Sequence, residues 1–250
     1  TALMTVAVIP FGDGLYATDI NAGVLYLLAV NSLGVYGVTL GGWASNSKYS
    51  LLGGLRAAAQ MISYELPMGM AVASCILFAG SLSMVDVVNS QEVWWNIFRN
   101  PIAAVIFVVA AFAEANRTPF DLVEAEQELV GGFHTEYSSM KFGMFFLAEY
   151  MHVMIGSMLI TTFFFGGYHL PFAGWWLPEM GPTAKAILDV SVFTVKTLFW
   201  AFVYIWVRWT IPRFKYNQVM KLGWMRMLPI SIFNFMGLAV IVYAWHHWLG

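Results

Sequence analysis

Long apolar runs separated by short polar connections make up most of the chain, and they show no strand-like alternation. A helix needs about 20 residues to cross the hydrocarbon layer of a bilayer. The pattern predicts six complete transmembrane helices and the end of a seventh at residues 1–9. The six lie at residues 21–43, 57–79, 101–116, 142–165, 186–207 and 228–248. We therefore predict an all-α polytopic integral membrane protein, with residues 1–250 in one domain.

The first residues, TALMTVAVIP, read as the end of an apolar segment. They lack the basic stretch and the cleavage site of a signal peptide. We expect that further N-terminal residues, with at least one membrane span, precede this sequence in the natural protein.

Lys and Arg residues are divided unequally between the two sides of the predicted spans. Connections at about 44–56, 117–141 and 208–227 carry nine of them, whereas the opposite connections carry only Arg99 and Lys185. Because Lys and Arg are enriched in cytoplasmic loops, we predict that the first set of connections is cytoplasmic. The nine residues are Lys48, Arg56, Arg117, Lys141, Arg208, Arg213, Lys215, Lys221 and Arg226.

The composition excludes several classes of protein. Charged residues make up 10% of the chain and hydrophobic residues 60%, whereas a soluble domain has about 25% charged residues. The net charge of −2 argues against nucleic-acid binding. A single cysteine, Cys75, cannot hold an iron–sulfur cluster, and no metal-ligand spacing or nucleotide-binding motif occurs. Any redox centre must therefore belong to another chain.

Three carboxylates, Glu65, Glu114 and Glu149, lie within predicted spans. A charge that faces lipid is expensive, so these side chains are expected to face the interior of the helix bundle. Either they converge on a wet path that exchanges protons, or each is a static anchor hydrogen-bonded between helices. His152, one turn from Glu149, either shares a proton with it or packs as a neutral side chain. Lys196 is a further charge at membrane depth, and Glu149 is a candidate partner for it.

Glycines in the first complete span predict a close helix contact. Gly34, Gly37 and Gly41 lie on this span, and the last two have the small-xxx-small spacing that allows helix backbones to approach closely.

Six of the fourteen acids fall in the short stretch 113–142. Pro119 is predicted to end the third span, because the residue before a proline avoids the helical region. Asp121 would then begin a short helix through Glu128, with Asp121, Glu124 and Glu128 on one face. This face is either simply solvated or part of a functional surface.

The stretch ANRTPFDLVEAEQELVGGFHTEYSSMKFGMFFLAEY resembles a signature of a membrane subunit of respiratory complex I, called the H subunit in bacteria and NADH dehydrogenase subunit 1 in mitochondria. GWASNSKYSLLGGLRAAAQMISYE (residues 42–65) and RWTIPRFKYNQVMKLGWMRMLP (residues 208–229) are similar to two further signatures of that family. The similarity covers essentially the whole chain, in order, and motifs of this length are specific.

The resemblance implies a subunit with eight transmembrane helices, of which the first and most of the second are absent here. Such a subunit forms much of the quinone chamber of a proton-pumping NADH:quinone oxidoreductase and passes the energy of quinone reduction to proton translocation. Quinone (ubiquinone in some members) is the substrate, while NADH, FMN and iron–sulfur clusters belong to partner subunits. The implied partners are the peripheral-arm quinone-site and iron–sulfur subunits and small neighbouring membrane subunits. A bacterial inner membrane is the expected location, with the mitochondrial inner membrane as the alternative.

The resemblance also implies roles for individual residues. Glu65, Glu114 and Glu149 would form the proton path, and Arg56 and Arg117 would flank the quinone cavity. The connection between the third and fourth spans would line the chamber through Asp121, Glu124, Glu126, Glu128, His134 and Glu136.

Three other functions are compatible with the same residues. The first is the homologous membrane subunit of a membrane-bound hydrogenase or formate hydrogenlyase, which uses no quinone. The second is a carboxylate-based secondary transporter, although no inverted repeat or pair of interrupted half-helices is evident. The third is a purely structural anchor for a peripheral arm.

Overall fold

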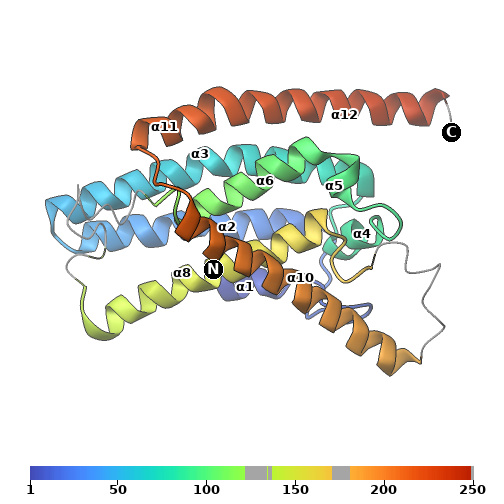
Figure 1. Cartoon of the computed structure of the whole chain (residues 1–250), viewed down its shortest axis with the longest axis horizontal. Coiled ribbons are helices and arrows are strands. Elements are labelled where there is room, and N and C mark those ends of the chain that lie inside the picture. Colours follow the sequence, from blue (N-terminus) through green and yellow to red (C-terminus); the bar gives the residue numbers. More distant parts are fainter. Residues whose placement is uncertain (122–133, 135–136, 171–180, 249–250) are drawn as a thin grey trace.

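The computed structural model describes residues 1–121, 134, 137–170 and 181–248, and its regular elements in those ranges are helices (Figure 1). The predicted all-α class is therefore confirmed. In chain order the helices are α1 (Ala2–Val6), α2 (Gly23–Ala44), α3 (Lys48–Ala79), α4 (Met84–Asn89), α5 (Asn96–Arg99), α6 (Pro101–Glu114), α8 (Ser139–Phe164), α10 (Pro182–Thr210), α11 (Tyr216–Lys221), the π-helix η2 (Leu222–Met227) and α12 (Leu228–Trp248).

Five helical segments in the described residues are long and apolar enough to cross a membrane, which supports an integral membrane protein. They are α2, α3, α8, α10 and the segment Tyr216–Ala244 that joins α11, η2 and most of α12. The remaining predicted span is α6, which has 14 residues. At 1.5 Å per residue α6 is about 21 Å long, less than the roughly 30 Å of a hydrocarbon core. The predicted count of six complete spans is therefore supported for five of them.

Local chemistry at both ends explains why α6 is short. The side chain of Asn100 accepts a hydrogen bond from the backbone N–H of Ala103 at 3.1 Å, and Pro101 occupies the first helical turn. At the other end Asn116 adopts a left-handed conformation with φ of 50°. Asparagine tolerates this conformation better than most residues and commonly ends helices. The helix therefore stops at Glu114, before the proline that was predicted to end it.

Much of two connections that were predicted as loops is helical. Only residues 45–47 separate α2 from α3, so most of the 44–56 connection forms the first turns of α3. Likewise, within the 208–227 connection, α10 continues to Thr210, and α11 and η2 lead into α12 without a break. The long helices thus extend past the apolar runs by which the sequence identifies them.

The close approach of α2 and α3 depends on glycine. A Cβ atom on Gly42 would lie 2.7 Å from the backbone oxygen of Ser50 and 3.2 Å from the Cα of Gly54, so no side chain fits there. A Cβ atom on Gly37 would meet nothing within 4 Å. The close contact therefore occurs at Gly42 and Gly54, and not at Gly37 as the small-residue spacing predicted.

Helix α3 lies at the centre of the bundle. It packs against α2, α6 and α12, while α10 crosses the bundle obliquely and packs against α8 (Figure 1). Ala103, Ala110 and Ala113 of α6 are completely buried, and their small side chains let α6 lie close to α3. The outer faces of α10 and α12 carry exposed apolar side chains, as expected for surfaces in contact with lipid or with other membrane subunits.

Two polar side chains of α3 fix the segments that surround it. The buried Gln60 donates from its Nε2 to the backbone oxygens of Ala113, at 2.7 Å, and Phe120, at 2.9 Å. Tyr64 donates from its hydroxyl to the backbone oxygen of Val219 at 2.9 Å. Gln60 therefore determines where the chain turns after α6, and Tyr64 holds α11 against the same helix.

Lys196 has a different partner from the one considered in the sequence analysis. Its Nζ donates to the backbone oxygens of Phe165, Gly167 and His169 at 2.7, 2.9 and 2.6 Å. These carbonyls follow the end of α8, where the helix dipole favours a cation. A Lys196–Glu149 pair is therefore wrong, because the ammonium already has an acceptor for each of its three hydrogens.

Another contact connects α10 to the segment after α1. The Nζ of Lys185 lies 2.7 Å from the carboxylate of Asp13 and holds the pKa of that carboxyl below its ordinary value. The backbone N–H of Asp13 donates to the carboxylate of Asp189 at 3.3 Å. Asp189 is thus tied to the N-terminal segment.

The bonds of Gln60 generate a test of the fold. We expect that Gln60→Met, which keeps the size of the side chain and removes its amide, lowers the thermal stability of the assembled protein. The carbonyl of Phe120 would stay buried without a donor, at a cost of about 1–3 kcal/mol, and that of Ala113 would keep only the backbone N–H of Asn116, at 3.4 Å. Cys75 is the chain's one cysteine and is buried, so its alkylation on heating, measured by mass spectrometry, reports unfolding.

Asn217→Met provides the control, because the side-chain amide of Asn217 lies exposed on α11. We expect Cys75 to react at temperatures several degrees lower in Gln60→Met than in the control. Equal alkylation curves for the two variants would show that the bonds of Gln60 do not hold α6.

Candidate functional site

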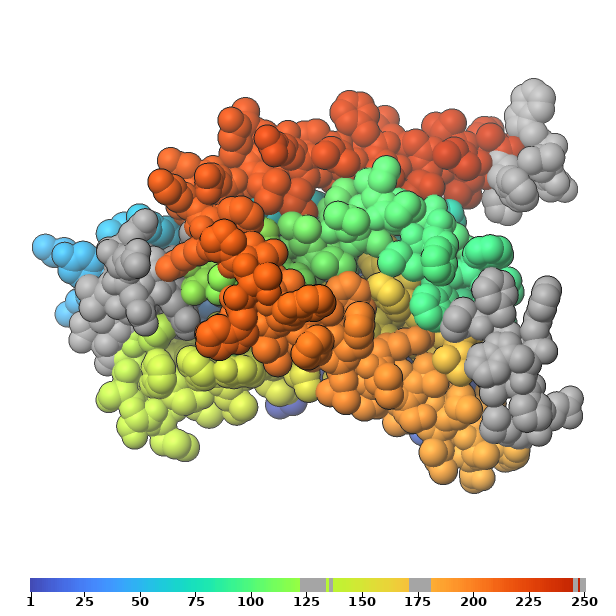
Figure 2. Space-filling model, in the orientation of Figure 1, coloured from blue at the N-terminus to red at the C-terminus, as the bar shows by residue number. Residues whose placement is uncertain are grey.

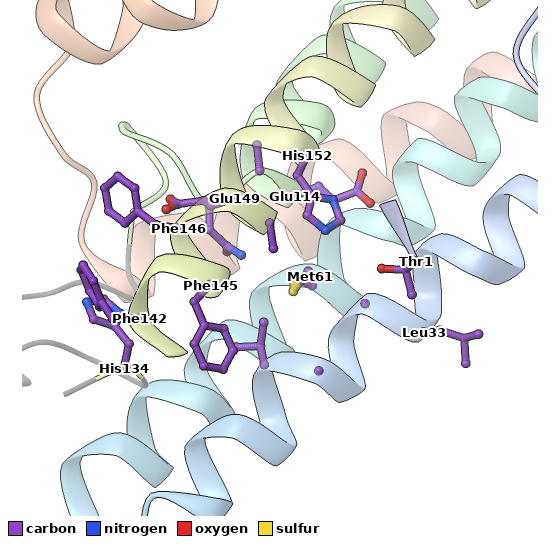
Figure 3. A pocket seen from close by; sticks show the side chains of 16 residues that line it. Thr1, Leu33, Met61, Glu114, His134, Phe142, Phe145, Phe146, Glu149 and His152 are labelled. Atoms are coloured by element: carbon purple, nitrogen blue, oxygen red, sulfur yellow. The ribbon is translucent and has the colours of Figure 1, made fainter. Parts of the chain in front are cut away.

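A cavity of about 330 Å³ lies between α2, the end of α6 and the first half of α8 (Figure 3). Helix α8 supplies one wall with residues at positions i, i+3, i+4, i+7 and i+10, which lie on one face of the helix. In chain order these are Phe142, Phe145, Phe146, Glu149 and His152. The face changes from aromatic side chains near the start of α8 to a carboxylate and an imidazole deeper along it.

The opposite wall is formed by α2, and its smallest residues make the space. Gly34 and Gly37 line the cavity, and no atom lies within 4 Å of a Cβ built on Gly37. The cavity therefore owes part of its volume to the absence of a side chain at this position.

Two neighbouring residues of α2 bind two carboxylates from different helices. Asn31 donates from its side-chain amide to Glu114 at the end of α6, and Ser32 donates from its hydroxyl to Glu65 near the middle of α3. The two carboxylates are close enough to interact electrostatically. Because Asn31 and Ser32 are adjacent, they connect Glu114 of the cavity wall to Glu65 behind it.

Glu149 forms an ion pair with Arg117. The Nε of Arg117 lies 3.1 Å from the carboxylate of Glu149, and the two side chains are 5% and 17% exposed. The guanidinium carbon lies 4.5 Å from the ring centre of Tyr150, in a cation–π contact. A buried pair of this kind is costly to break, since removal of one charge leaves the other without compensation.

His152 is positioned between the acids of the cavity. It lines the cavity together with Glu149 and Glu114 (Figure 3). It also lines a second space of about 10 Å³ with Asn31 and Glu114, which is close to the room that one water molecule needs. An imidazole at this position can accept or donate a proton on either side.

The structure brings several of the predicted site residues together. Glu114, Glu149 and His134 line the cavity, Arg117 is bonded to Glu149, and Glu65 is connected through α2.

Other predicted site residues lie elsewhere. Arg56 lies with its guanidinium carbon 5.6 Å from the ring centre of Tyr216, and Asp121 is half-buried and does not line the cavity. Four acids of the same prediction lie outside the described residues: Glu124, Glu126, Glu128 and Glu136.

The sequence analysis did not identify Asn31 and Ser32. A signal was available, because this adjacent polar pair interrupts a charge-free run from Ile20 to Ser47. Polar side chains inside a transmembrane helix usually hydrogen-bond to a neighbouring helix. The pattern could therefore have suggested a polar contact, but not the two acids that receive it.

The arrangement suits an apolar, flat molecule with polar edges. Aromatic side chains offer faces for stacking, and the acids and His152 can exchange protons with a polar group bound beside them. Within the described ranges, no group of three or more His, Cys, Asp or Glu side chains could hold a metal ion.

Comparison with known proteins gives a consistent family assignment. The profile of the family described as NADH dehydrogenase matches residues 1–239. NADH-quinone oxidoreductase subunit 8 of Rhodothermus marinus is 58% identical over 244 residues, which cover 94% of this chain and 72% of that protein. The NADH-quinone oxidoreductase H subunit of Salinibacter ruber is 55% identical over 246 residues, covering 93% and 70%. The H subunit of Flavobacterium johnsoniae is 49% identical over 247 residues, covering 94% and 70%.

These similarities extend over the helices and the cavity described above and confirm the resemblance found in the sequence. The chain belongs to the NADH dehydrogenase family, among the membrane subunits of NADH-quinone oxidoreductase that are designated H or 8.

Proposed function

We propose that the cavity is part of the quinone chamber of a proton-pumping NADH:quinone oxidoreductase of the complex I type, to which this chain contributes a membrane subunit. One observation carries the proposal: a single cavity joins an aromatic wall to Glu149 and Glu114. The names of the relatives, which contain NADH and quinone, support the same reaction.

The chemistry of a quinone matches the two kinds of surface in the cavity. Its flat ring can stack on Phe142, Phe145 or Phe146, and its carbonyl oxygens need hydrogen-bond or proton donors when they are reduced. The electrons would come from an iron–sulfur cluster of a partner subunit, which receives them from NADH through FMN. This chain would bind none of those cofactors itself and would supply the chamber and the proton-exchanging groups.

The proton path would run from Glu149 to Glu114 and then to Glu65. Reduction places negative charge in the chamber, and this charge changes the balance between Glu149 and its partner Arg117. His152 lies in position to pass a proton towards Glu114, and the hydrogen bonds of α2 connect Glu114 with Glu65. Movement of a charge across the membrane field costs about 2.3 kcal/mol per 100 mV, so a chain of enclosed titratable groups is needed.

The remaining predicted residues would form the mouth of the chamber towards the peripheral arm. His134 lines the cavity at this end. Arg56 lies against Tyr216 at the start of α11, among the Lys- and Arg-rich residues 208–226. The acids of the neighbouring connection would contact the quinone or the peripheral arm: Asp121, Glu124, Glu126, Glu128 and Glu136. The bacterial relatives favour a bacterial inner membrane as the location.

The alternatives receive less support. The relatives described above carry quinone oxidoreductase names, whereas a hydrogenase subunit would accompany a nickel-dependent catalytic subunit. A structural anchor would not need a cavity that joins aromatic side chains to proton-exchanging ones, and no inverted repeat or pair of interrupted half-helices in the sequence supports a transporter. Identification of the chains that co-purify with this one distinguishes the hydrogenase subunit and the transporter. Neutralisation of Glu65, Glu114 and Glu149 together, with turnover as the measurement, tests the structural anchor.

The first functional prediction concerns Glu149. In the assembled complex, Glu149→Gln is expected to lower quinone reduction and proton pumping together by about a hundredfold or more, the low end of what a proton-transferring group contributes. Quinone reductase assays and proton uptake in vesicles measure the two activities. Glu92→Gln makes the same change at an exposed acid that does not line the cavity, and it should leave quinone reduction and proton pumping unchanged. Normal turnover with normal pumping in Glu149→Gln would rule out its role in the path.

The second prediction concerns the size of the chamber. Gly37→Leu places a side chain into the open space of the cavity, so we expect it to raise the KM for quinone by about tenfold, with assembly unaffected. Gly69→Leu is the matched control, because a Cβ on Gly69 also meets nothing within 4 Å and Gly69 does not line the cavity. An unchanged KM in Gly37→Leu, with a folded complex, would show that quinone binds elsewhere.

A further inference from the structure

A second cavity opens on the lipid-facing side of the bundle, away from the proposed quinone chamber. It is a groove of about 520 Å³ between α6 and the region where η2 joins α12. Along α6 it extends from Pro101 to Val109, about 12 Å of helix. Figure 2 shows the surface of α6 beside that of α12, with the segment that leads into α12 adjoining both.

The surface of this groove is apolar throughout. Eight of the nine lining side chains are apolar, and the ninth, Arg226, lines the groove with the apolar part of its side chain. Val105 and Ile102 of the α6 wall are 64% and 50% exposed, so the groove is open to the surroundings of the helix. An exposed apolar surface within a membrane is normally covered by a lipid chain or by another helix.

Arg226, at the edge of the groove, belongs to a larger basic segment. Five Lys and Arg side chains lie between residues 208 and 226, and all five are exposed: Arg208, Arg213, Lys215, Lys221 and Arg226. No Asp or Glu occurs after Asp189, and in the described part of the chain no ion pair involves Arg226. Trp209 and Trp224 in the same segment are 83% and 47% exposed, as is typical of side chains at a membrane interface.

We propose that the groove between α6 and α12 is a binding site for an anionic phospholipid, with an acyl chain along α6 and the phosphate on Arg226. The apolar lining fits the acyl chain of a lipid, whereas the polar headgroup would lie outside the groove. The uncompensated cations distinguish an anionic phospholipid from a neutral one, since clusters of four to eight Lys or Arg next to a transmembrane helix attract anionic lipids.

The site differs in position and chemistry from the quinone chamber, so its test is independent of the proposed function. The assembled complex is reconstituted with phosphatidylglycerol that carries a photoreactive diazirine in one acyl chain, or with the phosphatidylcholine that has the same chains. Cross-linked peptides are then quantified by mass spectrometry. Phosphatidylglycerol is expected to label residues 101–109 and 222–230 about fivefold more than phosphatidylcholine.

Matched variants distinguish recognition of the lipid headgroup from binding of its acyl chain. Arg226→Gln should lower labelling by phosphatidylglycerol about fivefold, whereas Lys48→Gln, which removes an exposed cation outside this basic segment, should keep it within about twofold. Val105→Phe fills the groove and should abolish labelling of α6. Val195→Phe makes the same change at a valine of α10 that is 66% exposed, against 64% for Val105, and should not affect it.

Two outcomes would overturn the proposal. Equal labelling by the two lipids would show that the groove does not select an anionic headgroup. Cross-links from a photoreactive phenylalanine at Val105 to a neighbouring subunit, in place of lipid, would show that a protein helix occupies the groove.

Discussion

The arrangement of the bundle depends on the cost of placing a charge inside a membrane. A charged group there must find a partner, because lipid offers none. Arg117 compensates Glu149, Asn31 binds Glu114, Ser32 binds Glu65, and three backbone carbonyls bind Lys196. In each case the partner lies on a different segment of the chain. The polar contacts therefore determine which helices are neighbours, and the apolar surfaces fill the space between them.

The site in turn depends on packing at a distance from it. Arg117 reaches Glu149 only because the chain turns sharply after α6, and the buried Gln60 fixes that turn through Ala113 and Phe120. The completely buried alanines of α6 bring that helix close enough to α3 for Gln60 to make both bonds. The position of the guanidinium is thus set by small side chains and one amide, neither of which takes part in chemistry.

The sequence predicts the apolar helices and the three half-buried acids within them, because a carboxylate inside an apolar run is visible without any structure. It does not predict how far the helices extend, since residues 48–56 and 216–227 are polar enough to read as loops. The early end of α6 follows from one left-handed residue, Asn116. The partners of Lys196 are backbone carbonyls, which carry no signal in the sequence. Contacts of this kind depend on the relative placement of distant segments, and a single sequence does not encode that placement in a readable pattern.

The order of residues along α8 gives the cavity a direction. From Phe142 to His152 the helix advances by ten residues, or about 15 Å. Its cavity-facing side changes from aromatic rings to Glu149 and then to His152, with Glu114 opposite (Figure 3). A flat apolar ring would be held at the aromatic end, where stacking costs no buried charge, with its polar edge towards Glu149. A proton exchanged at that edge would have His152 and Glu114 on its inner side, so the helical periodicity of one segment would orient both the bound molecule and the proposed path.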